Sequence, residues 1–177
     1  THFRKKTETM RGKKFTLECS SHEELSVISI TSTLAGYRLI HHINKSLDID
    51  FAQQEDLPYY LTEKNVLQLP FYHCVHAPTQ NNWFMLSNSA QKQKKAIPAL
   101  KNVDFFLIID DMQSDAAKSN LLKHLRKIKG VQMATAISAA SVKKMELLYA
   151  DMELHLMEIQ KAQKENSASW SRKVHPE

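Results

Sequence analysis

The strongest feature of the hydrophobic pattern is an apolar run near the middle of the chain. Phe105 to Ile109 is uninterrupted, and Ile97-Pro98 precedes it across a short polar turn. A run without a polar face predicts a strand that is buried on both sides of a sheet. We therefore expect this central strand to lie at the core of the protein.

Several other segments alternate between apolar and polar residues or are rich in β-branched residues, as strands are. They are residues 15–19, 25–31, 48–52, one strand with its turns within 56–70, then 71–76, 83–87 and 131–137. Segments 71–76 and 83–87 are expected to form a hairpin, because Pro78 to Asn82 supplies turn residues between them.

Two amphipathic helices are predicted between the strands. The first follows Thr31-Ser32-Thr33, whose hydroxyls can cap it, and has an apolar face at Leu39, Ile40, Ile43 and Leu47. The second has Ser114 as its N-cap and closes at Gly130. A strand precedes and follows the second helix. This βαβ pattern predicts that both strands lie in one sheet with a right-handed connection.

A third, longer helix is predicted at the C-terminal end, with two sets of apolar residues at helical spacing. One set can dock on the sheet, namely Met145, Leu148, Met152, Leu156 and Ile159. The other set, Leu147, Leu154 and Met157, has no obvious partner within the chain. Exposed contiguous apolar area is typical of an interaction site, and methionines suit an adaptable one. The alternative is a deeper groove in the same domain. The candidate partner-binding residues are Met145, Leu147, Leu148, Met152, Leu154, Leu156, Met157 and Ile159.

Together these elements predict an α+β fold. We expect a mostly antiparallel sheet with helices on one face, a ferredoxin-like βαβ element and a long C-terminal helix. The expected organisation is a flexible basic arm over residues 1–14, an α+β domain over 15–140, the long helix over 141–165 and a disordered tail over 166–177.

The charge of the chain is concentrated in the basic arm. The arm holds six basic residues and one acidic residue, which accounts for the whole formal net charge of +5, and the rest of the chain is neutral. Such an arm can hold phosphate backbones, so RNA or DNA is the alternative partner, although a solvated leader has the same composition. The candidate contacts are Arg4, Lys5, Lys6, Arg11, Lys13, Lys14, Arg38 and Lys45.

The sequence offers no convincing catalytic, cofactor or metal site. Asp104 and Asp110 would lie about 20 Å apart on a regular strand, too far to share one ion. His73-Cys74-Val75-His76 would place only two ligands on one side of a strand. Three glycines form no phosphate-binding loop. We therefore expect a non-enzymatic binding or adaptor protein whose partner is another protein or a second copy.

The expected cellular compartment follows from features that the sequence lacks. No apolar run is long enough for a membrane helix, and no secretory signal pattern opens the chain. Two cysteines are too few and too far apart for a disulfide framework. The reducing cytoplasm is the expected location.

The central stretch resembles the signature of the bacterial IPExxxVDY family. The matching residues are Ile97, Pro98, Val103 and Asp104, while Ala99 stands in place of the family glutamate and Phe105 in place of its tyrosine. The similarity extends from about residue 25 to about residue 148, and it includes Tyr37-Arg38-Leu39, Asn44, Gly130-Val131 and Ala134-Thr135. The resemblance implies a shared fold and no particular chemistry.

Overall fold

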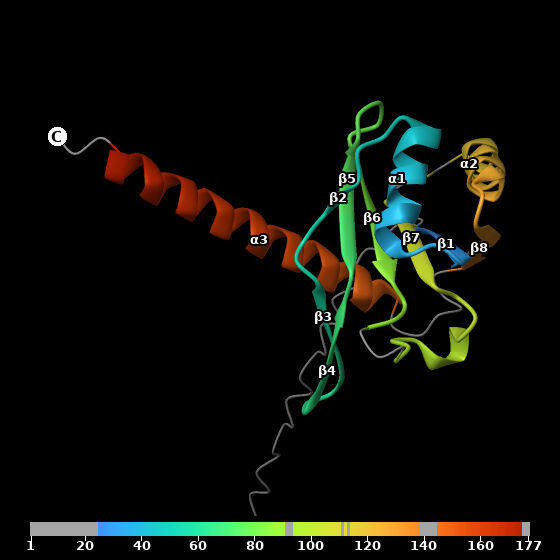
Figure 1. Cartoon of the computed structure of the whole chain (residues 1–177), viewed down its shortest axis with the longest axis horizontal. Coiled ribbons are helices and arrows are strands. Elements are labelled where there is room, and N and C mark those ends of the chain that lie inside the picture. Colours follow the sequence, from blue (N-terminus) through green and yellow to red (C-terminus); the bar gives the residue numbers. More distant parts are fainter. Residues whose placement is uncertain (1–24, 91–93, 111, 113, 139–144, 175–177) are drawn as a thin grey trace, which may run out of the picture.

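A six-stranded antiparallel sheet forms the centre of the protein (Figure 1). The computed structural model describes residues 25–90, 94–110, 112, 114–138 and 145–174. The sheet order is β2-β5-β6-β7-β1-β8. The strands are β1 (Ser26–Ser32), β2 (Ala52–Gln53), β5 (Phe71–His76), β6 (Asn81–Ser87), β7 (Phe105–Ile109) and β8 (Val131–Ser138). The α+β class predicted from the sequence is confirmed.

The central strand β7 is buried on both faces, as its apolar run predicted. Phe105, Leu107 and Ile109 belong to the core on one side of the sheet. Phe106 and Ile108 belong to the core on the other side. Alternate side chains of a strand point to opposite faces, so one apolar run serves two cores.

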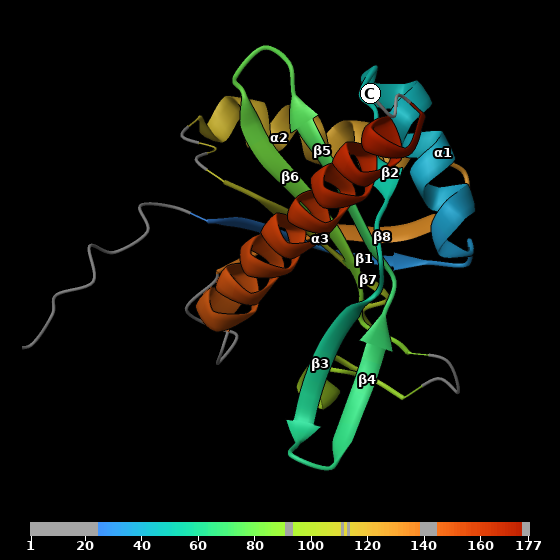
Figure 2. The same cartoon turned by 90° about the vertical axis from the view of Figure 1, so that its left-hand side faces the viewer.

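Helices α1 (Gly36–Leu47) and α2 (Asp115–Lys127) cover one face of the sheet (Figure 2). Ser114 caps α2 as predicted, because its hydroxyl oxygen accepts a hydrogen bond from the Ala117 N–H at 3.3 Å. The predicted hydroxyl cap of α1 is wrong. Ala35 is its N-cap, and the Ser32 and Thr33 hydroxyls donate to the carbonyl of Gly130 instead.

The strand–helix–strand unit formed by β7, α2 and β8 was predicted correctly as one unit in one sheet. Both strands pair antiparallel with β1, which lies between them, so β7 and β8 run in the same direction. This is the split βαβ arrangement of ferredoxin-like folds.

The long helix α3 (Met145–Val174) lies on the opposite face, together with a small two-stranded sheet of β3 (Leu57–Thr62) and β4 (Asn65–Leu69). The expectation that the helices share one face therefore holds for α1 and α2 but not for α3. The reason is the central sheet itself. Since β1, β6 and β7 are apolar on both sides, each face needs its own cover.

Other details differ from the sequence prediction. Residues 57–69 form a complete hairpin rather than one strand, and its turn at Glu63-Lys64 has neither Gly nor Pro to signal it. Asp48 takes a left-handed conformation with φ 54° and ends α1, so only Ala52–Gln53 of the predicted 48–52 strand joins the sheet. Helix α3 continues to Val174, so residues 166–174 are helical rather than part of a disordered tail. The predicted basic arm and the strand at 15–19 lie outside the described residues.

Candidate protein interface

The inner side of α3 is part of the core of the domain. Its docked residues are Met145, Leu148, Tyr149, Met152 and Leu156, each at most 8% exposed, and Ile159 at 6% ends the buried stripe. Beneath them lie Phe71, Phe84 and Phe106 from three neighbouring strands. Burial of this stripe supplies the tertiary packing that a helix in water needs for stability.

Two polar side chains fix how α3 sits on the sheet. The Tyr149 ring packs edge-on against Phe84 at 5.7 Å, and its hydroxyl donates to a Glu153 carboxylate oxygen at 2.8 Å. Burial first, and then the hydrogen bond to Glu153, raise the pKa of Tyr149 well above its usual value. One turn further on, the His155 Nε2 lies 3.1 Å from the Glu55 carbonyl oxygen. The Tyr149 ring and His155 thus tie α3 to β6 and to the segment before β3, whereas the Tyr149–Glu153 bond lies within the helix.

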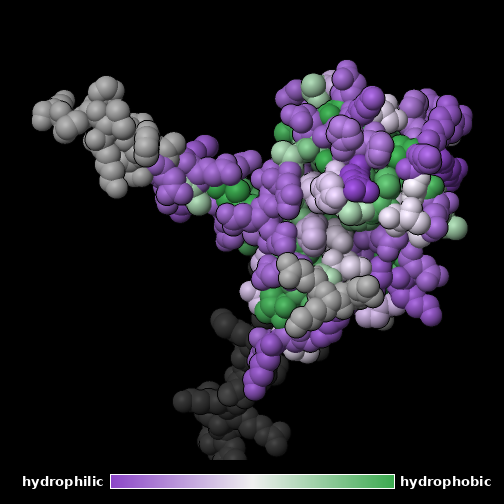
Figure 3. Space-filling model, in the orientation of Figure 1, coloured by the Kyte–Doolittle hydropathy of each residue, from purple (hydrophilic) through white to green (hydrophobic). Residues whose placement is uncertain are grey.

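The outer side of α3 presents an apolar stripe to solvent. Leu147 is 64% exposed, Leu154 53% and Met157 58%. These positions are spaced by seven and three residues, which aligns them along the helix directly opposite the docked stripe. The exposed Ala150 lies between the two leucines on the same line. Figure 3 shows hydrophobic (green) residues among the hydrophilic (purple) residues of this helix.

This arrangement confirms which stripe docks on the sheet, and it reduces the predicted set of partner-binding residues. Met145, Leu148, Met152, Leu156 and Ile159 are buried against their own domain and are not available to a partner. Leu147, Leu154 and Met157 remain exposed, so the alternative of a deeper groove that would cover them is wrong for these three. Ala150 was missed because alanine was not counted as apolar surface, although its heptad spacing was readable from the sequence.

Beyond Ile159 the helix leaves the sheet. Residues 160–166 are all exposed, and Figure 1 shows the last turns of α3 projecting away from the body of the protein. The outer stripe is flanked by carboxylates at Asp151 and Glu158, while Lys161 and Lys164 follow towards the C-terminal end. The stripe is thus an apolar surface with an acidic border.

The predicted nucleic-acid residues are only partly brought together. Arg38 and Lys45 are both exposed on α1, seven residues apart and therefore on one side of the helix. On the neighbouring α2, Lys123, Arg126 and Lys127 are also exposed. The arm residues Arg4, Lys5, Lys6, Arg11, Lys13 and Lys14 lie outside the described residues.

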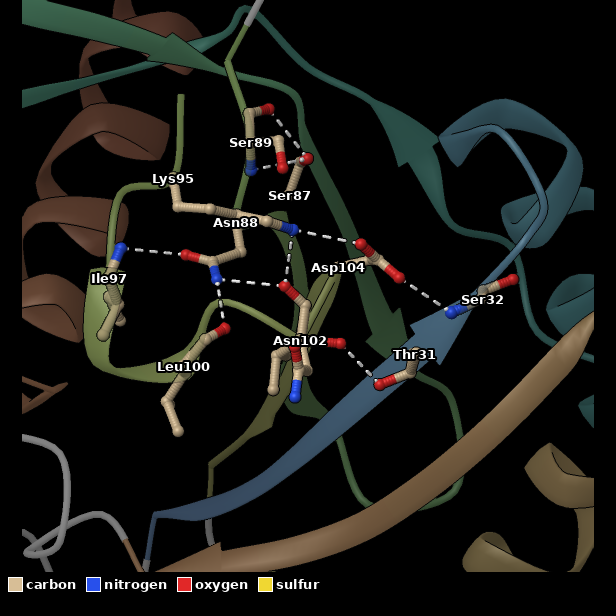
Figure 4. A network of polar contacts seen from close by, with 11 residues as sticks. Thr31, Ser32, Ser87, Asn88, Ser89, Lys95, Ile97, Leu100, Asn102 and Asp104 are labelled. Atoms are coloured by element: carbon tan, nitrogen blue, oxygen red, sulfur yellow. Dashed lines mark hydrogen bonds and ion pairs between the residues drawn. The ribbon is translucent and has the colours of Figure 1, made fainter. Parts of the chain in front are cut away.

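The stretch that resembles a family signature is held by a polar network (Figure 4). Asn88, fully buried, accepts a hydrogen bond from the Ile97 N–H at 2.9 Å and donates to the carbonyls of Leu100 and Val103, both at 3.0 Å. Lys95 donates to the Val103 carbonyl at 2.9 Å and forms an ion pair with Asp104 at 3.0 Å. These contacts satisfy the backbone of the turn before β7, which gives the signature a structural role.

The Asp104 carboxylate is fully engaged in this network. One oxygen faces Lys95, and the other accepts a hydrogen bond from the Ser32 N–H at 3.0 Å. Within the part of the chain that the structure describes, no group of three or more His, Cys, Asp or Glu side chains is arranged to hold a metal ion. Asn88 and Lys95 had no signal in the sequence pattern, because each looked like an ordinary loop residue.

The His-Cys-Val-His segment on β5 is split among separate partners. His73 Nε2 pairs with the Asn82 side chain at 2.9 Å, and His76 Nδ1 pairs with the Thr79 hydroxyl at 2.8 Å. Cys74 is buried, and this burial, followed by the nearby Asp50, raises the pKa of its thiol to about 12. A protonated buried thiol is a poor nucleophile.

A cleft of about 470 Å³ opens between the β5–β6 hairpin and the start of α2. The ring of His76 stacks on Trp83 in its wall, with centroids 4.9 Å apart. The remaining lining residues are Thr79, Asn81, Ile109, Met112, Ser114 and Ala117. The described lining contains no cysteine, lysine or carboxylate beside the histidine, and its hydroxyl groups belong to Thr79 and Ser114.

No family model, curated protein or solved structure matches this chain. Of the helices that the structure describes, none combines the length and apolar character required to cross a bilayer. The fold and its surfaces define an α+β protein in which one helix is longer than the core it covers.

Proposed function

We propose that this protein is a non-enzymatic adaptor that binds another protein along the outer face of α3. The observation that carries the proposal is the exposed stripe of Leu147, Leu154 and Met157, diametrically opposite the stripe that docks on the sheet. Isolated exposed apolar side chains are ordinary on any protein surface. Three that share one line on a rigid helix form a continuous apolar seam, and such a seam is the usual recognition surface for a second helix.

The seam indicates the chemistry of the partner. Its spacing fits an amphipathic helix with apolar residues at i, i+3, i+4 and i+7. Because Asp151 and Glu158 border the seam, a partner helix with lysine or arginine beside its apolar face is favoured over an acidic one. Beyond Ile159 the helix projects past the sheet with a mostly polar surface, so the body of the protein does not obstruct a partner there.

A matched pair of substitutions tests the proposal. Leu154→Glu places a charge in the middle of the seam, and Gln160→Glu places the same charge on an exposed position away from it. Capture from native lysate, with nuclease present, should recover a protein with the wild type and the Gln160→Glu variant but not with Leu154→Glu. Calorimetry with the purified partner should then show at least about a tenfold loss of affinity for Leu154→Glu.

Equal binding by the wild type and Leu154→Glu would reject the outer face of α3 as the interface. Sedimentation of the same three proteins separates a further outcome. A self-association that Leu154→Glu alone abolishes would mean that the seam binds a second copy rather than a different protein.

A second candidate function is nucleic-acid binding, which the exposed charges of α1 and α2 favour. The two helices lie on the same face of the sheet and present Arg38, Lys45, Lys123, Arg126 and Lys127, with Asp115 as the acidic residue of α2. Affinity for single-stranded RNA should fall steeply with salt if these residues contact phosphates. Deleting residues 1–14 and, separately, substituting Arg38→Glu and Lys45→Glu together distinguishes the arm from the helices. No binding at low salt would end this candidate.

We place the protein in the cytoplasm as part of the proposal. The support is the buried, free Cys74 thiol, which suits a reducing compartment. Fractionation of the native cells with an antibody against the protein would test this location.

A further inference from the structure

The two edges of the sheet differ in how they are protected. At one edge, β2 has only two residues, Ala52–Gln53, and offers little backbone to another chain. At the other edge, β8 spans eight residues, Val131–Ser138, with no proline, glycine or charged side chain. Edge strands are usually kept from pairing by shortness, charge or proline. By this measure β8 is unprotected (Figure 1).

Hydrogen bonds establish which backbone groups of β8 point outward. The Ser29 hydroxyl donates to the Thr135 carbonyl at 3.1 Å, so that carbonyl faces β1. The Ala136 N–H belongs to the same peptide unit and points the opposite way, out of the sheet. The carbonyl of Ala134 also points outward, and there the Arg126 side chain donates to it at 2.9 Å. Thus Arg126 of α2 covers the outward carbonyl of Ala134. Among the described residues, no hydrogen bond engages the outward backbone groups of Ala136.

The side chains of β8 are symmetrical about Thr135. Ala134 and Ala136 flank it, Met133 and Ile137 lie outside them, and Gln132 and Ser138 complete the pattern. An antiparallel strand of the same sequence, centred on the same threonine, therefore meets like with like at every position. Met133, 60% exposed, would lie beside Ile137 of the second strand. The small alanines permit close approach, and no like charges oppose each other.

We propose that β8 pairs edge to edge with β8 of a second copy, antiparallel, with the two-fold axis at Thr135. The outward N–H of Ala136 then donates to the outward carbonyl of Ala134 in the other copy, and the symmetry repeats the bond. The six-stranded sheets of the two copies become one continuous sheet. This proposal is independent of the outer face of α3, because the two surfaces share no residue.

Arg126 acts as a competitor in this arrangement. Its hydrogen bond to Ala134 occupies the carbonyl that the second copy needs, so pairing requires the side chain to swing away. Removing the guanidinium in Arg126→Ala should therefore strengthen self-association by at least about tenfold, because each of the two copies loses one competing charged hydrogen bond. If β8 plays no part in assembly, Arg126→Ala should not strengthen self-association.

Analytical ultracentrifugation of the full chain tests the pairing. The wild type is expected to dimerise, and Ala136→Pro should raise the dissociation constant by at least about tenfold, because proline lacks the outward N–H. Ala136→Val is the matched control, since it keeps that N–H and a residue suited to strands. Circular dichroism of both variants confirms that they fold.

A disulfide experiment tests the register without relying on Ala136→Pro. In a Cys19→Ser background, Thr135→Cys places two thiols on the two-fold axis, in a non-hydrogen-bonded pair about 4.5 Å apart between Cα atoms. It should form a covalent dimer under mild oxidation. Gln132→Cys is the control, because its symmetry mate would lie about 20 Å away along the strands.

Three results would overturn the proposal. The first is a monomer at every concentration for both the wild type and Arg126→Ala. The second is a dimer that Leu154→Glu abolishes and Ala136→Pro leaves intact, which would assign self-association to α3. The third is equal crosslinking of Thr135→Cys and Gln132→Cys. A monomer whose edge is covered by residues 1–24, or by an extended segment of another protein, would give the first of these results.

Discussion

The two faces of the central sheet are covered in different ways. On one face, α1 and α2 have 12 and 13 residues, and each keeps one buried stripe while the rest of its surface is polar or basic. On the other face, α3 has 30 residues, of which only the stretch from Met145 to Ile159 touches the core. Each face has its own buried core, but only on the second does the helix extend beyond the residues that pack on it. The exposed apolar side of this helix, at Leu147, Leu154 and Met157, is where we expect an external partner.

The largest test of this comparison is whether the two cores contribute equally to stability. Phe106→Ala empties the core under α3, and Leu107→Ala empties the core under α1 and α2. Each should lower the free energy of unfolding by about 3–5 kcal/mol, because large-to-small changes lose burial and leave a cavity. Chemical denaturation measures both values. A cost below about 1 kcal/mol for either variant would mean that its face is not a packed core.

A smaller effect is expected at the polar network that joins β6, β7 and β1 at one end of the sheet. Asn88→Ala would leave the Ile97 N–H without its partner, while the Leu100 carbonyl keeps the Val103 N–H at 2.9 Å. A buried unsatisfied group costs about 1–3 kcal/mol, so we expect a loss of about 2 kcal/mol in chemical denaturation. Asn88→Asp keeps the acceptor and loses the donors, and should fall between Asn88→Ala and the wild type. Equal stability of Asn88→Ala and the wild type would contradict the proposed role of the network.

The face under α1 and α2 should also carry a pH dependence of its own. Burial raises the pKa of Cys74 from 9.0 to about 12. Below pH 9 the thiol is protonated in both states, so its contribution is fully present. Between pH 9 and 12 the unfolded chain ionises first, so stability falls as pH rises through this window. Urea unfolding against pH should show a shallower alkaline loss for Cys74→Ala than for the wild type. The same slope in both would exclude Cys74 as its source.

The smallest effect is expected from removing the part of α3 that follows the docked residues. A chain that ends at Gln160 keeps every docked residue and loses only positions that are exposed or lie beyond the described side chains. Its free energy of unfolding should change by less than about 0.5 kcal/mol. Met152→Ala, within the docked stripe, should cost about 2–5 kcal/mol. Comparable losses for the truncation and Met152→Ala would show that the projecting turns stabilise the domain.

The sequence by itself determined the local elements wherever the hydrophobic period was strong. The apolar run at Phe105 to Ile109, the hairpin around Pro78, the Ser114 cap and the two stripes of the long helix were all readable. Hydrophobic periodicity and turn residues are local properties, so they can be read from a short stretch of sequence without knowing which segments pack against it. The same reading could not detect the turn at Glu63-Lys64, which lacks the usual turn residues.

Only the tertiary structure decided which surfaces are inside. The sequence separated the two apolar stripes of α3, but only the packed sheet shows that the longer one is buried and that Leu147, Leu154 and Met157 stay exposed. Asn88, Lys95 and Asp104 are ordinary polar residues until the chain brings them together around one turn. Likewise, β8 is an edge only because β1 pairs with it on one side and no described strand pairs on the other. Burial, polar satisfaction and strand order are non-local quantities, so they arise when distant segments meet.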